Sequence, residues 1–297
     1  DLEDLRRAVQ PRWDRPRNDP WHHAGPDSTH LALRSGQPLS ASLLSETPHE
    51  LVVSPWVVRA RLGGLVFDTN KSFLLPDAVE SAPGLGAPID ELRHWFAECG
   101  RSHALVVGHT DTTGDPSNND PLSLERAEAF LAYVQQDVAH WLAWYGLDRP
   151  WEKRWGAHED RLMLEAVARR LGLALIGDVV SAYQQLRRLD VDGSIGTQTR
   201  GALVPDYMAL QDTTTVLPDT LLVHGCGESF PRTGKRDEAG VEGVPVAGDD
   251  ASQRRVEVFL FDRALGVQPP PPGAVSSPGS LEYPDWVRRS RHTREWT

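Results

Sequence analysis

The segment GHTDTTGDPSNNDPLSLERAEAF, from Gly108 to Phe130, joins the end of an apolar run to a polar loop and an amphipathic stretch. The run from His103 to His109 is short and apolar, which is typical of a central strand. The stretch after the loop repeats apolar residues at steps of three and four, which predicts one continuous helix about 35 Å long. Its apolar stripe comprises Leu124, Ala127, Leu131, Val134, Val138, Trp141 and Tyr145.

The start of this helix gives Arg126 an unusual position. Either Asp120, which is followed by Pro121, or Ser123 fits the helix N-cap. We therefore expect Arg126 in about the first turn, where a cation opposes the helix dipole. An anion held jointly by Arg126 and the helix N-terminus would account for this position.

Composition and charge exclude several classes of protein. The net charge of −11 disfavours nucleic-acid binding and docking to anionic lipid. No apolar run approaches the ~20 residues that span a bilayer, so we expect no membrane span in this chain. The only cysteines, Cys99 and Cys226, lack metal-site spacing, and we expect no metal and no cofactor. Whether the two cysteines pair stays open, and two free buried thiols are the simpler alternative.

Local composition predicts an α/β fold, an α+β sandwich, with additions. Residues 51–149 and 216–264 alternate strands and helices in the order β-α-β-α-β-β, which places helices on one face of a small mixed sheet. Residues 150–215 form an all-α insertion between the two parts. Residues 1–50 are expected to be an irregular arm, and residues 265–297 an extended, Pro-rich tail.

Hydrophobic patterns place the individual elements. The expected strands are Trp56 to Asp68, His103 to His109, Thr220 to Glu228 and Arg254 to Asp262. The expected shorter helices are Ile89 to Cys99, His158 to Gly172 and Val179 to Leu189. In the last strand, apolar residues at positions 256, 258 and 260 alternate with Glu257 and Phe259, so its two faces differ.

Five pieces of the chain together resemble the OmpA-like peptidoglycan-binding domain. They are VFD at Val66 with the Pro-containing turn after it, GHTDTTGD, NDPLSLERA, HGCGESFP and QRRVEVFL. The likeness extends over Val66 to Val134 and Leu221 to Asp262. In that family the domain binds the peptide stem of cell-wall peptidoglycan through its diaminopimelate residue.

The resemblance implies a set of ligand-binding residues. Asp111 would hold the ammonium and Arg126 the carboxylate of the zwitterionic end of diaminopimelate. Thr110, Thr112 and Asn119 would line the same pocket. The pair Arg254 and Arg255 would support the pocket, and strand alternation lets only one of the two face inward.

The insertion carries a second resemblance. DVDGSIGTQTRGAL, from Asp190 to Leu203, is similar to the repeat of a small three-helix peptidoglycan-binding module. Its DGxxGxxT loop contains Asp192 and Thr199, whose side chains can hydrogen-bond the loop backbone. A second ligand site at these residues and a purely structural insert both remain open.

Three functions are weighed. The first is a non-catalytic binder of diaminopimelate-type peptidoglycan in the bacterial cell envelope, facing the periplasm or delivered by a secretion machine. The second is a hydrolase using His109, Asp111 and His140, which is not favoured because no HExxH or GxSxG motif occurs. The third is an adaptor, since the lead-in VVRARLGGLVFDTNKSFLLP is similar to OmpA-family proteins of contractile or type VI-like secretion machinery. Residues 1–50 and the tail would then contact a protein partner.

Overall fold

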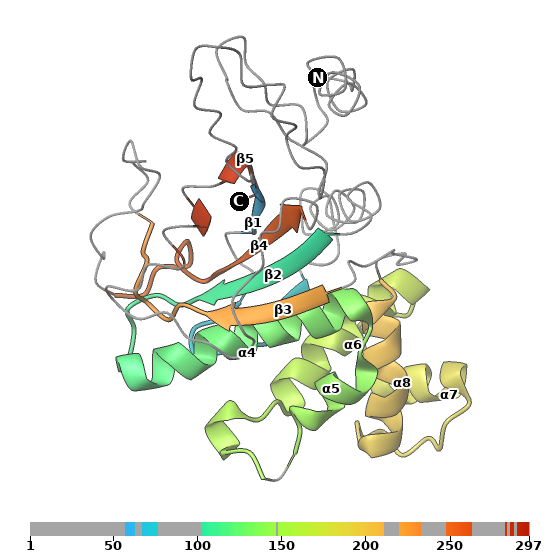
Figure 1. Ribbon diagram of the computed structural model, residues 1–297. Coiled ribbons are helices and arrows are strands. Elements are labelled where there is room, and N and C mark those ends of the chain that lie inside the picture. The colour runs from blue at the N-terminus through green and yellow to red at the C-terminus, as the bar shows by residue number, and fades with distance from the viewer. Residues whose placement is uncertain are drawn as a thin grey trace, which may run out of the picture.

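The protein has a mixed α/β fold, as the sequence predicts (Figure 1). A computed structural model describes residues 57–62, 67–76, 102–146, 148–210, 220–232, 248–262, 283, 286–287 and 290–296. The predictions for residues 1–50, for the helix at Ile89 to Cys99 and for any Cys99 pairing lie outside these residues.

Five strands form one mixed sheet in the order β3-β2-β4-β1-β5. The strands are β1 Val57–Leu62, β2 Ser102–His109, β3 Thr220–Gly225, β4 Arg255–Asp262 and β5 Ser290–Trp296. Strands β2 and β3 are parallel, as are β1 and β5, while β4 runs antiparallel to both β1 and β2. The four strands predicted from the sequence are confirmed, although β1 and β3 are shorter than expected. Strand β5 lies in the tail and was not predicted as part of the sheet.

The helices from α4 to α8 lie on one side of this sheet. They are α4 Pro116–Gln135, α5 Val138–Ala143, the short 3₁₀ helix η2 Trp151–Lys153, α6 Ala157–Leu171, α7 Val179–Arg187 and α8 Thr197–Met208. Helix α4 runs along β2 and β3, and α5 to α8 pack on the far side of α4 (Figure 1). No helix in the described ranges is long and apolar enough to cross a membrane.

The contact between α4 and the sheet requires glycine at the end of β2. A Cβ atom at Gly108 would lie 1.9 Å from the carbonyl oxygen of Ser123 in α4. A Cβ at Gly225, the last residue of β3, would lie 2.6 Å from Oγ of Ser123. Because no side chain fits at either position, α4 lies directly on the backbone of both strand ends.

The predicted single long helix is wrong in both its start and its length. Helix α4 begins at Pro116, with Asp115 as the N-cap that accepts a hydrogen bond from the amide of Ser117. It ends at Gln135, its C-cap Gln136 adopts the left-handed conformation with φ 56°, and α5 follows as a separate helix. Arg126 therefore lies well inside α4, and the predicted cooperation between Arg126 and the helix N-terminus does not occur.

The insertion shares one hydrophobic core with α4 and the sheet. The centre of this core contains the rings of Phe73, Trp141, Trp155 and Tyr207. The ring centres of Trp141 and Trp155 are 4.9 Å apart, and those of Phe73 and Tyr207 are 5.7 Å apart. These aromatic side chains are core residues, whereas Trp151 is 79% exposed. The insertion is thus packed against the sheet domain rather than attached through a linker.

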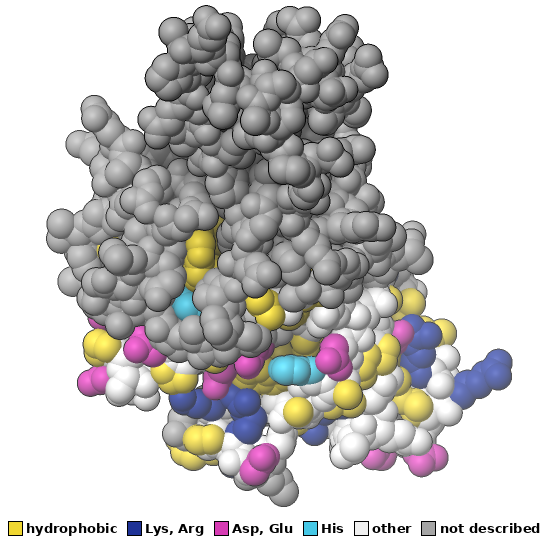
Figure 2. Space-filling model, in the orientation of Figure 1, with side chains coloured by type: hydrophobic (Ala, Val, Ile, Leu, Met, Phe, Trp, Pro, Cys, Tyr) yellow, Lys and Arg dark blue, Asp and Glu magenta, His cyan; other side chains and the backbone are white. Residues whose placement is uncertain are grey.

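Charged side chains on the outside of the insertion form several ion pairs. Arg161 pairs with Glu165 at 3.1 Å, and Arg187 pairs with Asp206 at 2.5 Å. Acidic and basic side chains are interspersed over the described part of the face in Figure 2. Since exposed pairs contribute little to stability, the aromatic core holds the insertion in place.

The face of the sheet away from the helices is also buried. Leu105, Val107 and Phe259 pack there against Tyr283 and Trp286 of the tail. Cys226 belongs to the same buried cluster.

This face also carries a buried group of charges. Glu257 accepts hydrogen bonds from Arg59 Nε at 2.9 Å and Arg255 Nε at 2.7 Å, and the Tyr283 hydroxyl contacts both its oxygens. The tail therefore closes a charged cluster that would otherwise lie open to water.

Candidate functional site

Asp111 lies in the loop after β2, at the end of the sheet covered by α4. Its side chain is buried, and Oδ2 accepts a hydrogen bond from Arg254 Nη1 at 2.7 Å. Oδ1 accepts a weaker one from the amide of Thr113 at 3.2 Å. The acid predicted to hold an ammonium group is thus paired with an arginine of the same chain.

Arg126 reaches this loop from α4, and the protein backbone occupies all its nitrogens. Nε donates to the carbonyl of Lys71 at 2.9 Å, Nη1 to that of His109 at 3.0 Å and Nη2 to that of Asp68 at 3.1 Å. The residue is 1% exposed, and its guanidinium lies 5.2 Å from the ring centre of Phe67. One N–H on each η nitrogen is left over, but the residue is enclosed, so a ligand carboxylate could reach it only if the surrounding segments moved.

Burial dominates the electrostatics of Arg126. It lowers the pKa of the guanidinium to about 9, with the charge of Asp111 opposing this shift and that of Arg254 adding to it. Three carbonyl dipoles and the nearby carboxylates of Asp111 and Glu125 compensate the buried charge. The side chain consequently joins the turn at residues 68–71 to the end of β2.

Arg254 precedes β4 and is the cation that faces Asp111. Its Nε donates to the carbonyl of Phe67 at 3.0 Å, and its Nη1 is shared between Asp111 and Asp249. Burial alone would lower its pKa, but the pairs with Asp111 and Asp249 raise it overall. Arg254 therefore stays charged at the centre of the site.

Asp249 approaches Arg254 from the exposed side. Its side chain is 61% exposed and also accepts a hydrogen bond from Thr69 Oγ1 at 3.2 Å. The preceding residue, Gly248, donates its amide to Thr112 Oγ1 at 2.9 Å. The hydrogen bond from Arg254 is the main cause of the lowered pKa of Asp249.

Two further predicted ligand-binding residues, Asn119 and Thr110, lie beside Asp111. The amide of Asn119 donates to the carbonyl of Asp111 at 3.3 Å and to Glu228 Oε2 at 2.5 Å. Thr110 is buried, and its Oγ1 has no hydrogen-bond partner among the described residues. The structure thus brings together six of the seven predicted ligand-binding residues: Thr110, Asp111, Thr112, Asn119, Arg126 and Arg254.

The seventh, Arg255, does not join them. Its side chain lies on the opposite face of the sheet, where it pairs with Glu257 and donates to the carbonyl of Phe230 at 2.9 Å. This outcome follows the predicted alternation, because neighbouring strand residues point to opposite faces. Arg255 is therefore removed from the set of candidate ligand-binding residues.

The histidines considered for a hydrolase are not brought together. His109 packs against Tyr283 at 5.0 Å on the face away from α4, whereas His140 is exposed on α5. The described residues also contain no group of three acidic, histidine or cysteine side chains placed to hold a metal ion.

The predicted second site in the insertion is occupied by a structural contact. Gln184 is buried, and its amide nitrogen donates to Asp192 Oδ1 at 2.7 Å, Ser194 O at 3.0 Å and Thr199 Oγ1 at 3.0 Å. Its oxygen accepts from the amides of Asp192 and Gly193. The geometry favours the structural interpretation of Asp192 and Thr199, because both side chains hold the loop.

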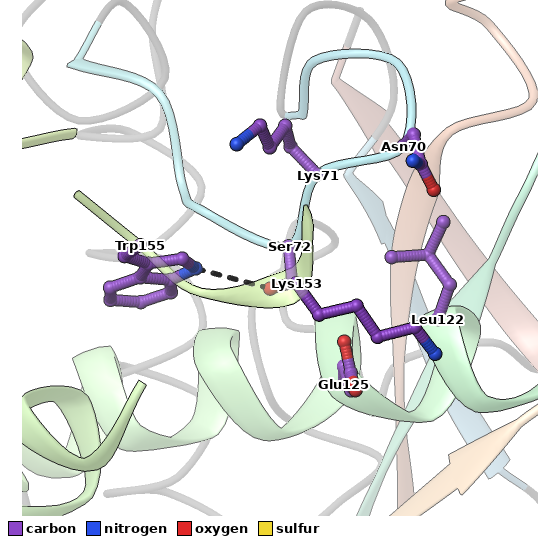
Figure 3. Close-up of a pocket in the computed structure, with 7 residues that line it drawn as sticks. All are labelled: Asn70, Lys71, Ser72, Leu122, Glu125, Lys153 and Trp155. Atoms are coloured by element: carbon purple, nitrogen blue, oxygen red, sulfur yellow. Dashed lines mark hydrogen bonds between the residues drawn. The ribbon is translucent and has the colours of Figure 1, made fainter. Parts of the chain in front are cut away.

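A small pocket lies beside the turn at residues 68–71 (Figure 3). It is lined by Asn70, Lys71, Ser72, Leu122, Glu125, Lys153 and Trp155. Trp155 Nε1 donates to Ser72 Oγ at 3.3 Å at its edge, and the Lys153 side chain extends past Glu125 toward Leu122. None of the predicted ligand-binding residues lines this pocket.

Two acidic residues that contact the predicted ligand-binding residues, Asp249 and Glu228, could not be identified from the sequence. Asp249 lies in a polar loop, and only its position five residues before Arg254 sets it apart from other loop acids. Glu228 follows β3 and reaches Asn119 across 109 positions in the sequence. Neither contact follows from local periodicity or spacing.

No protein-family model matches this sequence, and no curated protein matches it significantly.

Proposed function

We propose that this protein binds cell-wall peptidoglycan without cleaving it, through the diaminopimelate of the peptide stem, and thereby attaches itself or a partner to the bacterial wall. The observation that carries the proposal is the convergence of Asp111, Arg126 and Arg254 at one end of the sheet. A carboxylate and two guanidinium groups in one place match the charge pattern of a zwitterionic amino acid.

The order of the elements supports the resemblance to the OmpA-like domain. Strands β1 and β2, helix α4 and strands β3 and β4 occur in the implied order, and the helix expected between β1 and β2 lies outside the described residues. Helices α5 to α8 stand where that domain has only a short link between its second helix and third strand. The insertion lies on the side of α4 away from the sheet (Figure 1).

The chemistry of the site suits a ligand with an ammonium and a carboxylate close together. Asp111 and Glu228, which both contact Asn119, supply negative charge for the ammonium. Arg254 supplies the guanidinium for the carboxylate. Two or three charge-assisted hydrogen bonds of about 1.5–3 kcal/mol each give at best micromolar-class affinity.

The test is a calorimetric titration with a diaminopimelate-containing stem peptide and with its lysine-containing counterpart. The lysine form lacks the terminal carboxylate, so it should bind at least tenfold more weakly, about 1.4 kcal/mol or more. Asp111→Asn should abolish binding of the first peptide because the amide carries no charge for the ammonium. Asp190→Asn, an exposed acid in the insertion, is the matched control and should bind as the wild type does.

Cosedimentation with purified cell-wall sacculi gives an independent check. Undiminished sedimentation of Asp111→Asn, or equal affinity for the two peptides, would refute the proposed ligand. The adaptor role in a secretion apparatus stays a prediction. Of its two expected partner surfaces, residues 1–50 lie outside the described part of the chain, and the described part of the tail packs on the sheet through Tyr283, Trp286 and β5.

A further inference from the structure

We propose that Asp249 occupies the place of the ligand's carboxylate on Arg254 in the free protein, so that Asp249 and the ligand compete for this arginine. The inference rests on the proposed function and assigns Arg254, rather than Arg126, as the residue that binds the carboxylate. Arg126 becomes a positioning residue that holds the turn beneath the site.

The two arginines differ in what their nitrogens already contact. All three nitrogens of Arg126 donate to backbone carbonyls at 2.9–3.1 Å, and these acceptors are fixed parts of the fold. Arg254 donates through Nε and Nη1, and its Nη2 makes no hydrogen bond to a described residue. Each η nitrogen of Arg126 keeps a second N–H, but Arg126 is 1% exposed and enclosed by these carbonyls. On Arg254, a carboxylate that binds both Nη1 and Nη2 takes the position that Asp249 holds on Nη1.

The two carboxylates on Arg254 differ in exposure. The Asp111 side chain is 5% exposed, whereas that of Asp249 is 61% exposed. An exposed ion pair is easily exchanged, while a buried one is costly to break. A ligand carboxylate that arrives from solvent will therefore displace Asp249 and leave the pair between Arg254 and Asp111 intact.

The surrounding contacts allow Asp249 to leave without disturbing β4. Its segment is held by the hydrogen bond from Thr69 and by that from Gly248 to Thr112, both on exposed atoms. The next residue, Asp250, makes a separate turn by accepting from the amide of Ser252 at 2.9 Å. That turn fixes the chain before β4, so Asp249 can move independently of it.

An internal carboxylate lowers the apparent affinity of any ligand that needs the same arginine. It competes at the high effective concentration of a tethered group. The lysine peptide lacks the side-chain carboxylate that would compete for Arg254, so Asp249 should affect binding of the diaminopimelate peptide and not that of the lysine peptide.

The experiment compares wild type with Asp249→Asn, with both peptides, in the titration described above. We expect Asp249→Asn to bind the diaminopimelate peptide about two- to fivefold more tightly, the factor that corresponds to loss of one exposed ion pair. Its affinity for the lysine peptide should equal that of the wild type. Asp249→Glu keeps a competing carboxylate and should show little gain.

A matched control separates competition from a general change of charge. Asp68 is also half-exposed beside the site, and its carboxylate faces His158 at 3.6 Å rather than Arg254. Asp68→Asn removes the same charge, so under competition it should leave the affinity for both peptides unchanged. An equal gain in Asp68→Asn and Asp249→Asn would overturn the inference.

The outcomes also distinguish this inference from the proposed function. If the wild type binds the diaminopimelate peptide and Asp249→Asn binds it no more tightly, Asp249 does not compete and the inference alone fails. If neither the wild type nor Asp249→Asn binds that peptide, the proposed function fails as well. Because Asp249 is exposed, Asp249→Asn should fold, and its thermal unfolding can be checked directly.

Discussion

Replacing Arg126 by alanine tests whether this residue holds the fold or contacts a ligand. The side chain joins three segments, because its acceptors are the carbonyls of Asp68 and Lys71 in one turn and of His109 at the end of β2. Truncation leaves these carbonyls without their donor and opens a cavity under Phe67. The structure therefore predicts a loss of stability even in the absence of ligand.

The size of the loss follows from the number of contacts. Three hydrogen bonds from a charged donor contribute about 1.5–3 kcal/mol each, and relief from burying the charge offsets part of their sum. We expect Arg126→Ala to lower the free energy of unfolding by roughly 3–5 kcal/mol, a large share of the 5–15 kcal/mol typical of a domain. Arg126→Lys keeps a charge but reaches fewer carbonyls, so it should lose about 1–3 kcal/mol.

Urea unfolding followed by tryptophan fluorescence measures the effect. The midpoint should fall in Arg126→Ala with the slope unchanged. Arg161→Ala is the control, because Arg161 is 60% exposed in a pair with Glu165 and should change stability by under about 0.5 kcal/mol. If Arg126→Ala unfolds at the wild-type urea concentration but loses peptide binding, the positioning role is wrong and Arg126 contacts the ligand.

Three further predictions concern other parts of the fold. Gly108→Ala should fold poorly or lose several kcal/mol in thermal unfolding, because its Cβ would lie 1.9 Å from a backbone oxygen of α4; wild-type stability would contradict the packing described. Gln184→Ala should cost about 2–4 kcal/mol and speed hydrogen exchange in the loop at residues 192–194, since that loop loses its buried partner; unchanged exchange would exclude this role. The lowered pKa of Asp249 means that its stabilising pair with Arg254 is present above its ordinary value of 3.8 and lost as the pH falls further. The stability advantage of wild type over Asp249→Asn should thus shrink below that pH, and a constant difference would contradict the pair.

The strands could be predicted because their pattern reflects burial directly. Val256, Val258 and Leu260 pack toward α4, while Phe259 packs toward the tail, as strict alternation requires. The break after α4 could not be predicted, because the apolar stripe continues through it. Gln136 ends the helix by adopting a left-handed conformation, and the spacing of apolar residues carries no information about that backbone angle.

Most of the charged site could be predicted, but its pairing could not. The resemblance brought Asp111 together with Arg126 and Arg254, and the structure places all three side by side. Which arginine pairs with the acid depends on backbone carbonyls at residues 67–71, and no side-chain pattern encodes the direction of a carbonyl. The contact of Asp249 depends on the path of its loop, which sequence spacing does not determine.

The charged cluster under the tail limits how these positions can diverge. Glu257 is fully buried with Arg59 and Arg255, and each depends on the others and on the Tyr283 hydroxyl for its hydrogen bonds. Loss of one partner leaves a buried charge without a counter-charge and lowers the stability by about 3–5 kcal/mol, whereas replacing the whole cluster by apolar residues can leave the stability unchanged. Homologous chains should consequently either keep all four of these residues or replace them together. Position 283 in the tail should therefore covary with positions in the middle of the sheet.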